Sequence, residues 1–164
     1  MVEYFKFEFI IDNKKFICIW FSGEKDGFIS EGGKIKDFCN FDQLHSYALE
    51  NNIEIIDEGS ELSVDFAQKW DFTKEKVINC KYFLHFWNMI SDLSYSVNEN
   101  FYGDKKNRTL NKIYDKLFYG NNLPAITPEG KEYIPIWSKK EIDELNKVVK
   151  DGLRIMNSYV MIKE

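Results

Sequence analysis

Two runs of alternating residues at the start of the chain restrict its fold more than any other feature. Residues 3–11 place every second side chain on one apolar face, made of Phe5, Phe7, Phe9 and Ile11. Residues 15–21 are apolar on both faces, which is typical of a strand in the middle of a sheet. Asp12, Asn13 and Lys14 stand between the runs and have turn-forming composition. The pattern predicts a β-hairpin whose second strand is central.

Further along, the chain mixes one more strand with helical patterns. Residues 53–56 are predicted to form a third strand. The glycine-bearing residues 22–40 are predicted to form a loop or an irregular hairpin. Apolar residues at helical spacing predict four helices before the C-terminal one: residues 42–51, 63–70, 78–96 and 107–119.

Two of the helical patterns carry further information. Residues 78–96 are apolar around most of the helix, so we expect this helix at the centre of the domain. The last helix begins with the capping-box residues Ser138 and Glu141. Gly152 lies inside it at a cost of about 1 kcal/mol relative to alanine, so a bend or a loosening is expected there. The segment 123–137, with three prolines, is predicted to be extended and rich in turns.

These elements predict a single α+β domain over residues 1–164. A chain of this length buries ~70% of its unfolded surface on folding. The N-terminal hairpin and the third strand form a small, mainly antiparallel sheet that packs against several helices, including the long C-terminal one.

Motifs for nucleotide and metal chemistry fail on their spacing. Gly27 and Gly32 have the spacing of a P-loop, but Gly33 stands where the lysine is needed. Pairs of cysteine and histidine, Cys39 with His45 and Cys80 with His85, do not have the usual spacing of zinc ligands. We therefore predict no metal, no cofactor and no enzymatic activity.

The cysteines and the hydropathy of the chain indicate in which cellular compartment the protein is expected. The three cysteines, Cys18, Cys39 and Cys80, form neither a CxxC pair nor an even-numbered framework. The N-terminus lacks the layout of a secretory signal, and no apolar run approaches the ~20 residues that span a bilayer. Free thiols, a cytoplasmic location and no membrane contact are the expectation.

The formal net charge of −5 is unevenly distributed. Residues 1–100 carry 18 acids and 10 bases, whereas residues 101–164 carry 9 acids and 12 bases. Arginine supplies the planar fork that binds phosphate in a bidentate manner, and the chain has only Arg108 and Arg154. Nucleic-acid binding is therefore disfavoured.

Acidic side chains are concentrated between residues 50 and 71, where seven acids accompany a single base, Lys69. A surface of this kind either keeps a protein soluble or steers a cationic partner towards it. Under the second interpretation, five acids make electrostatic contacts and one tryptophan is an apolar anchor: Asp57, Glu58, Glu61, Asp65, Asp71 and Trp70.

A polar stripe on the central helix offers a different kind of site. Spacings of four, three and four residues align Lys81 with the candidate ligand-binding residues, which are His85, Asn88 and Asp92. Such a stripe is either the solvent-exposed face of an otherwise buried helix, or it supplies a general base with a carboxylate that orients it. The second interpretation predicts a small-ligand site or an active site.

In its overall character the chain resembles the immunity proteins of bacterial toxin–immunity systems, including those of contact-dependent growth inhibition. The residues that carry the resemblance are the Asp26-Gly27-Phe28 loop and the helix positions Cys80, Leu84, Trp87, Asn88 and Asp92. The resemblance implies a non-enzymatic protein that neutralises a cationic toxin, commonly a nuclease, by covering its active site or another essential surface. Membership of an uncharacterised assembly is a further alternative.

Overall fold

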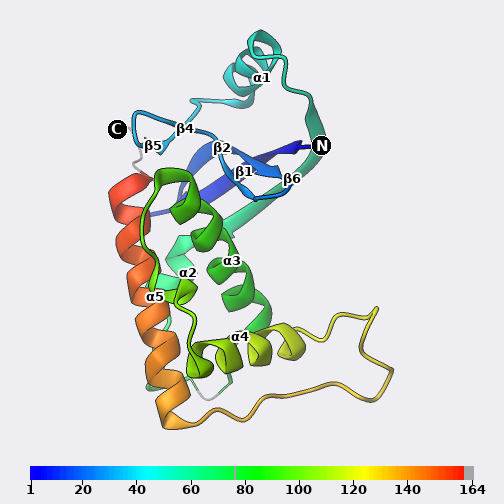
Figure 1. Ribbon diagram of the computed structural model, residues 1–164, viewed down its shortest axis with the longest axis vertical. Helices are drawn as coiled ribbons and strands as arrows, with labels where there is room; N and C mark the ends of the chain where they lie inside the picture. The colour runs from blue at the N-terminus through cyan, green and yellow to red at the C-terminus, as the bar shows by residue number, and fades with distance from the viewer. Residues whose placement is uncertain (76, 161–164) are drawn as a thin grey trace.

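The computed structural model describes residues 1–75 and 77–160, in which a mixed four-stranded sheet packs against helices (Figure 1). The sheet consists of β1 (Glu3–Ile11), β2 (Lys14–Ser22), β3 (Gly27–Phe28) and β6 (Ile55–Ser63). A separate two-stranded sheet consists of β4 (Ser30–Glu31) and β5 (Lys34–Ile35). The helices are α1 (Phe41–Glu50), α2 (Val64–Lys69), α3 (Cys80–Val97), α4 (Arg108–Gly120) and α5 (Lys139–Tyr159), with a short 3-10 turn, η1 (Tyr102–Asp104). The predicted α+β class, including the long C-terminal helix, is confirmed.

The N-terminal hairpin has the predicted pairing, from Glu3 opposite Ser22 to Ile11 opposite Lys14. Its two-residue turn is Asp12-Asn13, and both residues have positive φ, at 51° and 61°. This is the geometry that matches the right-handed twist of the two strands. Asparagine and aspartate tolerate it better than other side chains that bear a Cβ.

The strand order is β3-β2-β1-β6, so β2 is interior, as predicted, and β6 is an edge strand. β6 runs parallel to β1, and the other two pairings are antiparallel. The third strand begins at Ile55, two residues later than predicted, and continues to Ser63. The reason is that the Ile53 N–H donates to the Ala48 carbonyl and so closes the end of α1.

Helix α3 occupies the centre of the domain, as its nearly all-apolar sequence predicts. One of its faces packs on the sheet residues Phe7, Phe9 and Phe28, and other faces contact α4 and α5. Asn79 caps its N-terminus by accepting from the Tyr82 N–H, and Asn98 ends it in the left-handed conformation. A smaller cluster on the other face of the sheet packs against α1 through Leu44.

Gly152 does not interrupt the C-terminal helix, where a bend or a loosening was expected. Helix α5 continues through it without interruption, and the capping box of Ser138 and Glu141 is present. Gly152 is buried where α5 crosses α3, and a Cβ at this position would lie 2.7 Å from Cε1 of Phe86. The glycine therefore lets the two helices approach closely.

The segment 121–138 contains no helix or strand, in agreement with its predicted extended character. It leaves the body after α4 and returns to the start of α5 as a long excursion, at the lower right of Figure 1. None of the helices in the described part of the chain has the length and apolarity needed to cross a membrane.

Candidate functional site

A bulge in the edge strand β6 displays part of the acidic segment. Phe5 of β1 pairs with Ile56 and Phe7 pairs with Ser60, so residues 57–59 stand opposite the single residue Lys6. Gly59 leaves room for this lysine, because a Cβ there would lie 3.3 Å from Lys6 Cε. Bulges of this kind redirect side chains and interrupt strand pairing.

Three of the predicted partner-binding residues, Asp57, Glu58 and Glu61, lie exposed on this strand, and we call them the acidic strand. The Asp57 carboxylate lies 3.7 Å from Lys6 Nζ and is fully exposed. Within residues 1–75 and 77–160, the carboxylates of Glu58 and Glu61 have no hydrogen bond or ion pair. Two acids of the strand are thus free to meet an external cation.

Asp65 belongs to the interior and does not lie on this surface. Its residue is only 9% exposed, and its carboxylate accepts hydrogen bonds from the Asp12 N–H at 2.7 Å and the Asn13 N–H at 3.0 Å. These bonds, with the one from Asn13 foremost, lower the pKa of Asp65. The carboxylate holds the left-handed hairpin turn, and Asp65 is therefore not available for the partner contact predicted from the sequence.

Trp70 and Asp71 also contact residues close to them in the fold. The Trp70 ring is half-buried and packs against Phe66 and Phe83, each with its centroid 5.3 Å away. Asp71 accepts from the backbone N–H and the hydroxyl of Thr73, and these bonds lower its pKa. Both residues are near the acidic strand in sequence number. The Trp70 ring packs on its neighbours, whereas the Asp71 carboxylate binds Thr73 and its side chain remains 44% exposed.

The polar stripe of α3 does not converge on one ligand. The Nε2–H of His85 donates to the Glu61 carbonyl of β6 at 3.1 Å. Asn88 accepts from the Tyr114 hydroxyl of α4 at 2.7 Å, and Asp92 accepts from the Trp20 indole of β2 at 2.8 Å. Each side chain binds a different element, as expected for polar groups that join a central helix to its neighbours. Burial lowers the pKa of His85, which favours its neutral form.

Asp92 is expected to make stability depend on pH. Burial, with smaller contributions from the charges of Asp26 and Asp104, raises its pKa from 3.8 to about 6. The folded state therefore holds the proton more tightly than the unfolded state. The stability that this provides is complete below about pH 4 and is lost as the pH rises through about 6.

Asp92→Asn keeps an acceptor for Trp20 and removes the titration. We expect the variant to gain stability relative to the wild type as the pH is raised from about 4 to about 7.5. Urea denaturation of both proteins across this range measures the difference. A difference that is the same at every pH would contradict the assignment.

A polar cleft of about 570 Å³ lies between α3, α4 and the segment that joins them. Trp87, Asn88 and Tyr114 line it, whereas His85 and Asp92 do not. The cleft therefore contains only one of the three residues predicted for a ligand site. The Trp87 and Tyr114 rings meet edge to face at 5.4 Å and form its aromatic part.

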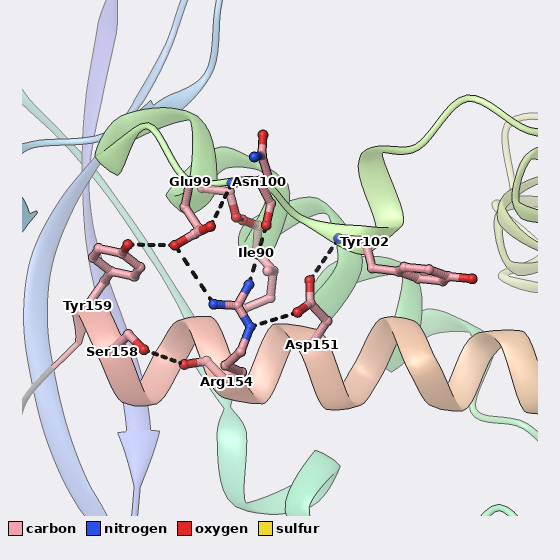
Figure 2. A network of polar contacts seen from close by, with 9 residues as sticks. Ile90, Glu99, Asn100, Tyr102, Asp151, Arg154, Ser158 and Tyr159 are labelled. Carbon is pink, nitrogen blue, oxygen red and sulfur yellow. Dashed lines mark hydrogen bonds and ion pairs between the residues drawn. The ribbon is translucent and has the colours of Figure 1, made fainter.

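A second polar network surrounds Arg154 of α5 (Figure 2). Its Nε donates to Asp151 at 2.8 Å, and its guanidinium lies 3.8 Å from Glu99, which also accepts from the Tyr159 hydroxyl. Asp151 in turn accepts from the backbone N–H of Tyr102. These contacts fasten the α3–α4 connection to α5, so one of the two arginines of the chain has a structural role.

The sequence interpretation missed an exposed apolar surface. Six of the eleven large apolar side chains that the described residues expose lie between positions 119 and 136: Tyr119, Leu123, Ile126, Tyr133, Ile134 and Ile136. We call residues 121–137, together with Tyr119 at the end of α4, the apolar arm. A long segment of apolar residues and prolines without a helical or strand period is the signal that could have identified it.

No family model, no curated protein and no solved structure matches this chain. Within the described residues, no cluster of three or more histidine, cysteine, aspartate or glutamate side chains has the arrangement of a metal site.

Proposed function

We propose that this chain is a non-enzymatic immunity protein that binds a cationic protein toxin, of which a nuclease is the expected kind, and neutralises it in the cytoplasm. The observation that carries the proposal is the exposed acidic strand, with Glu58 and Glu61 unpaired among the described residues. Carboxylates held on a strand keep a fixed spacing, which suits recognition of a patterned basic surface.

Charge distribution supports the same proposal. The acidic strand lies within residues 1–100, which carry 18 acids and 10 bases, so the wider field reinforces the attraction of a cation. The α3 polar stripe, in contrast, binds the protein's own elements. Its side chains are better explained as structural links than as catalytic groups.

The proposal is tested with the protein encoded immediately upstream of this chain, because immunity genes lie beside their toxins. Co-expression of the chain is expected to restore growth to cells that produce that protein. Purified chain is expected to bind its catalytically inactivated form, with an affinity that falls steeply as salt is added. Growth arrest that co-expression does not relieve, together with absence of binding at low salt, would refute the proposal.

A second candidate function is small-ligand binding or catalysis in the cleft of about 570 Å³ beside Trp87 and Asn88. Its polar and aromatic lining favours this alternative. Filling the cleft by Asn111→Trp distinguishes the two functions. A small molecule that raises the melting temperature of the wild-type chain but not of this variant, in a chain that does not neutralise the upstream-encoded protein, would favour the cleft.

A further inference from the structure

A groove of about 520 Å³ lies between α4 and the apolar arm, and it has no part in the proposed toxin binding. Lys112, Lys116 and Tyr119 line it from α4, where spacings of four and three residues put them on one face of the helix. The arm contributes Ile126 and Tyr133. A volume of this size lies within the range of pockets that hold small ligands.

Most of the groove is lined by apolar atoms. Its three largest apolar side chains are incompletely covered by the fold, since Tyr119 is 57% exposed, Ile126 is 53% exposed and Tyr133 is 42% exposed. These three side chains face the same hollow. An apolar group that entered the groove would remove this surface from water, and the hydrophobic effect would therefore favour its binding.

Hydrogen bonds at the base of the arm keep the groove formed. The Asn122 side chain donates to the Tyr133 carbonyl at 2.9 Å and accepts from the Tyr133 N–H at 2.7 Å, and it also donates to the Gly120 carbonyl at 3.1 Å. A ligand therefore meets an ordered site, which reduces the entropy lost on binding. The Asn122 amide and the Tyr133 backbone are occupied, whereas an extended peptide needs free main-chain partners. The groove thus suits a small molecule better than a peptide strand.

The charges that line the groove select the sign of the ligand. They are three lysines and one acid: Lys112, Lys116, Lys131 and Asp115. The Lys116 ammonium is already neutralised, because it lies 2.8 Å from the Glu141 carboxylate and its side chain is only 16% exposed. In the described part of the chain, the ammonium groups of Lys112 and Lys131 have no hydrogen bond, ion pair or ring contact. Asp115 offsets one of these two charges, so the groove keeps one positive charge that a single negative charge would balance.

We propose that this groove binds a small amphipathic carboxylate, such as a medium-chain fatty acid. The apolar body lies against Tyr119, Ile126 and Tyr133, and the carboxylate accepts charge-assisted hydrogen bonds from Lys112 and Lys131. A carboxylate carries one negative charge near neutral pH, whereas a phosphate monoester carries about 1.5 to 2. Residues 101–164, with 9 acids and 12 bases, also attract an anion.

Calorimetric titration of the full chain with decanoate, below its micelle concentration, tests the site. One molecule is expected to bind per chain, with a dissociation constant on the order of 10–100 µM. Acetate has the head without the apolar body, and decylammonium has the same body with the opposite charge. Each is expected to bind at least about 10-fold more weakly. Absence of decanoate binding, equal binding of decylammonium, or uptake of many molecules without saturation would overturn the proposal.

Lys112→Gln combined with Lys131→Gln is expected to weaken decanoate binding at least about 10-fold, because the carboxylate loses both charged partners. Both lysines are exposed, so circular dichroism and the melting temperature should not change. Lys14→Gln combined with Lys150→Gln is the matched control, since it makes the same change in net charge at two exposed positions that do not line the groove. The control should bind decanoate as the wild type does. Equal affinities of the two double variants would contradict the assigned site.

Thiol labelling locates the bound ligand. Cys39 is the exposed native cysteine, and Cys18 and Cys80 are buried, so Cys39→Ser gives a background of low reactivity. In that background Thr127→Cys places a thiol in the groove, and decanoate at ten times its dissociation constant is expected to slow the reaction with N-ethylmaleimide about tenfold. Leu49→Cys is the control, because Leu49 is exposed on α1 and its rate should not change. An unchanged rate at position 127 would overturn the assignment.

The ligand site and the proposed toxin binding are independent of each other. The groove is formed by α4 and the apolar arm, whereas the acidic strand belongs to β6. All measurements with decanoate are made without the upstream-encoded protein. A failure of ligand binding would therefore leave the test of neutralisation untouched, and the reverse also holds.

Discussion

Glu58→Lys combined with Glu61→Lys is expected to weaken binding of the upstream-encoded toxin by at least about 100-fold at low salt. Both carboxylates are exposed, and neither has a partner among the described residues, so the substitutions change charge without removing an internal contact. Placing like charges across an interface costs several kcal/mol, and the association rate falls because steering is reversed. Growth protection should be lost in parallel.

The measurement is an equilibrium and kinetic titration at two salt concentrations. Glu24→Lys combined with Glu129→Lys is the matched control, because it makes the same change in net charge at two exposed loop positions. The control should retain most of the affinity. If both double variants weaken binding equally, net charge rather than the acidic strand is responsible, and the assignment of the site is wrong.

Gly152→Val is expected to lower the free energy of unfolding by about 3 kcal/mol or more. The first added carbon would lie 2.7 Å from Cε1 and 2.9 Å from Cζ of Phe86, a side chain that is 1% exposed. Overpacking of this kind typically costs ~1–3 kcal/mol, and the second and third carbons of valine increase it. For a domain of this size, such a loss corresponds to a melting temperature lower by roughly 6–12 °C.

Asn157→Val is the control for Gly152→Val, because it places the same β-branched residue at an exposed position of the same helix. Asparagine and valine have similar helix propensity, so urea denaturation should detect little change. Combining Gly152→Ala with Phe86→Leu should cost less than the sum of the single changes, since the smaller side chain makes room. Additive costs would show that the α3–α5 contact is not what requires glycine.

Much of the fold follows from local pattern. The Asp12-Asn13 turn, the capping box of Ser138 with Glu141 and the apolar circumference of α3 each predict an element that is present. The direction of β6 could not be predicted in this way, because pairing depends on where α1 returns the chain. Residues 53–54 precede the strand because Asn52 is left-handed and the Ile53 N–H binds the Ala48 carbonyl, which closes the C-terminus of α1 locally.

The candidate site was less predictable, and Asp65 and Glu61 show why. These two acids are four positions apart, yet Asp65 is 9% exposed beneath the hairpin turn, whereas Glu61 is exposed on the edge strand. Composition locates a cluster of charge but does not say which members the fold uses internally. The same is true of the apolar arm, whose isoleucines would look like core residues in any segment with a regular period.

Periodicity, capping residues and turn chemistry were sufficient to define the α+β class and most of the elements, because each depends on interactions within a few residues. Exposure was decided by tertiary packing. Packing places Gly152 against Phe86, binds Asp65 to the hairpin, leaves Glu58 and Glu61 free in the described structure and turns Ile134 and Ile136 outwards. Whether a side chain meets water or another residue depends on contacts between distant segments, and these contacts decide where the protein can bind a partner.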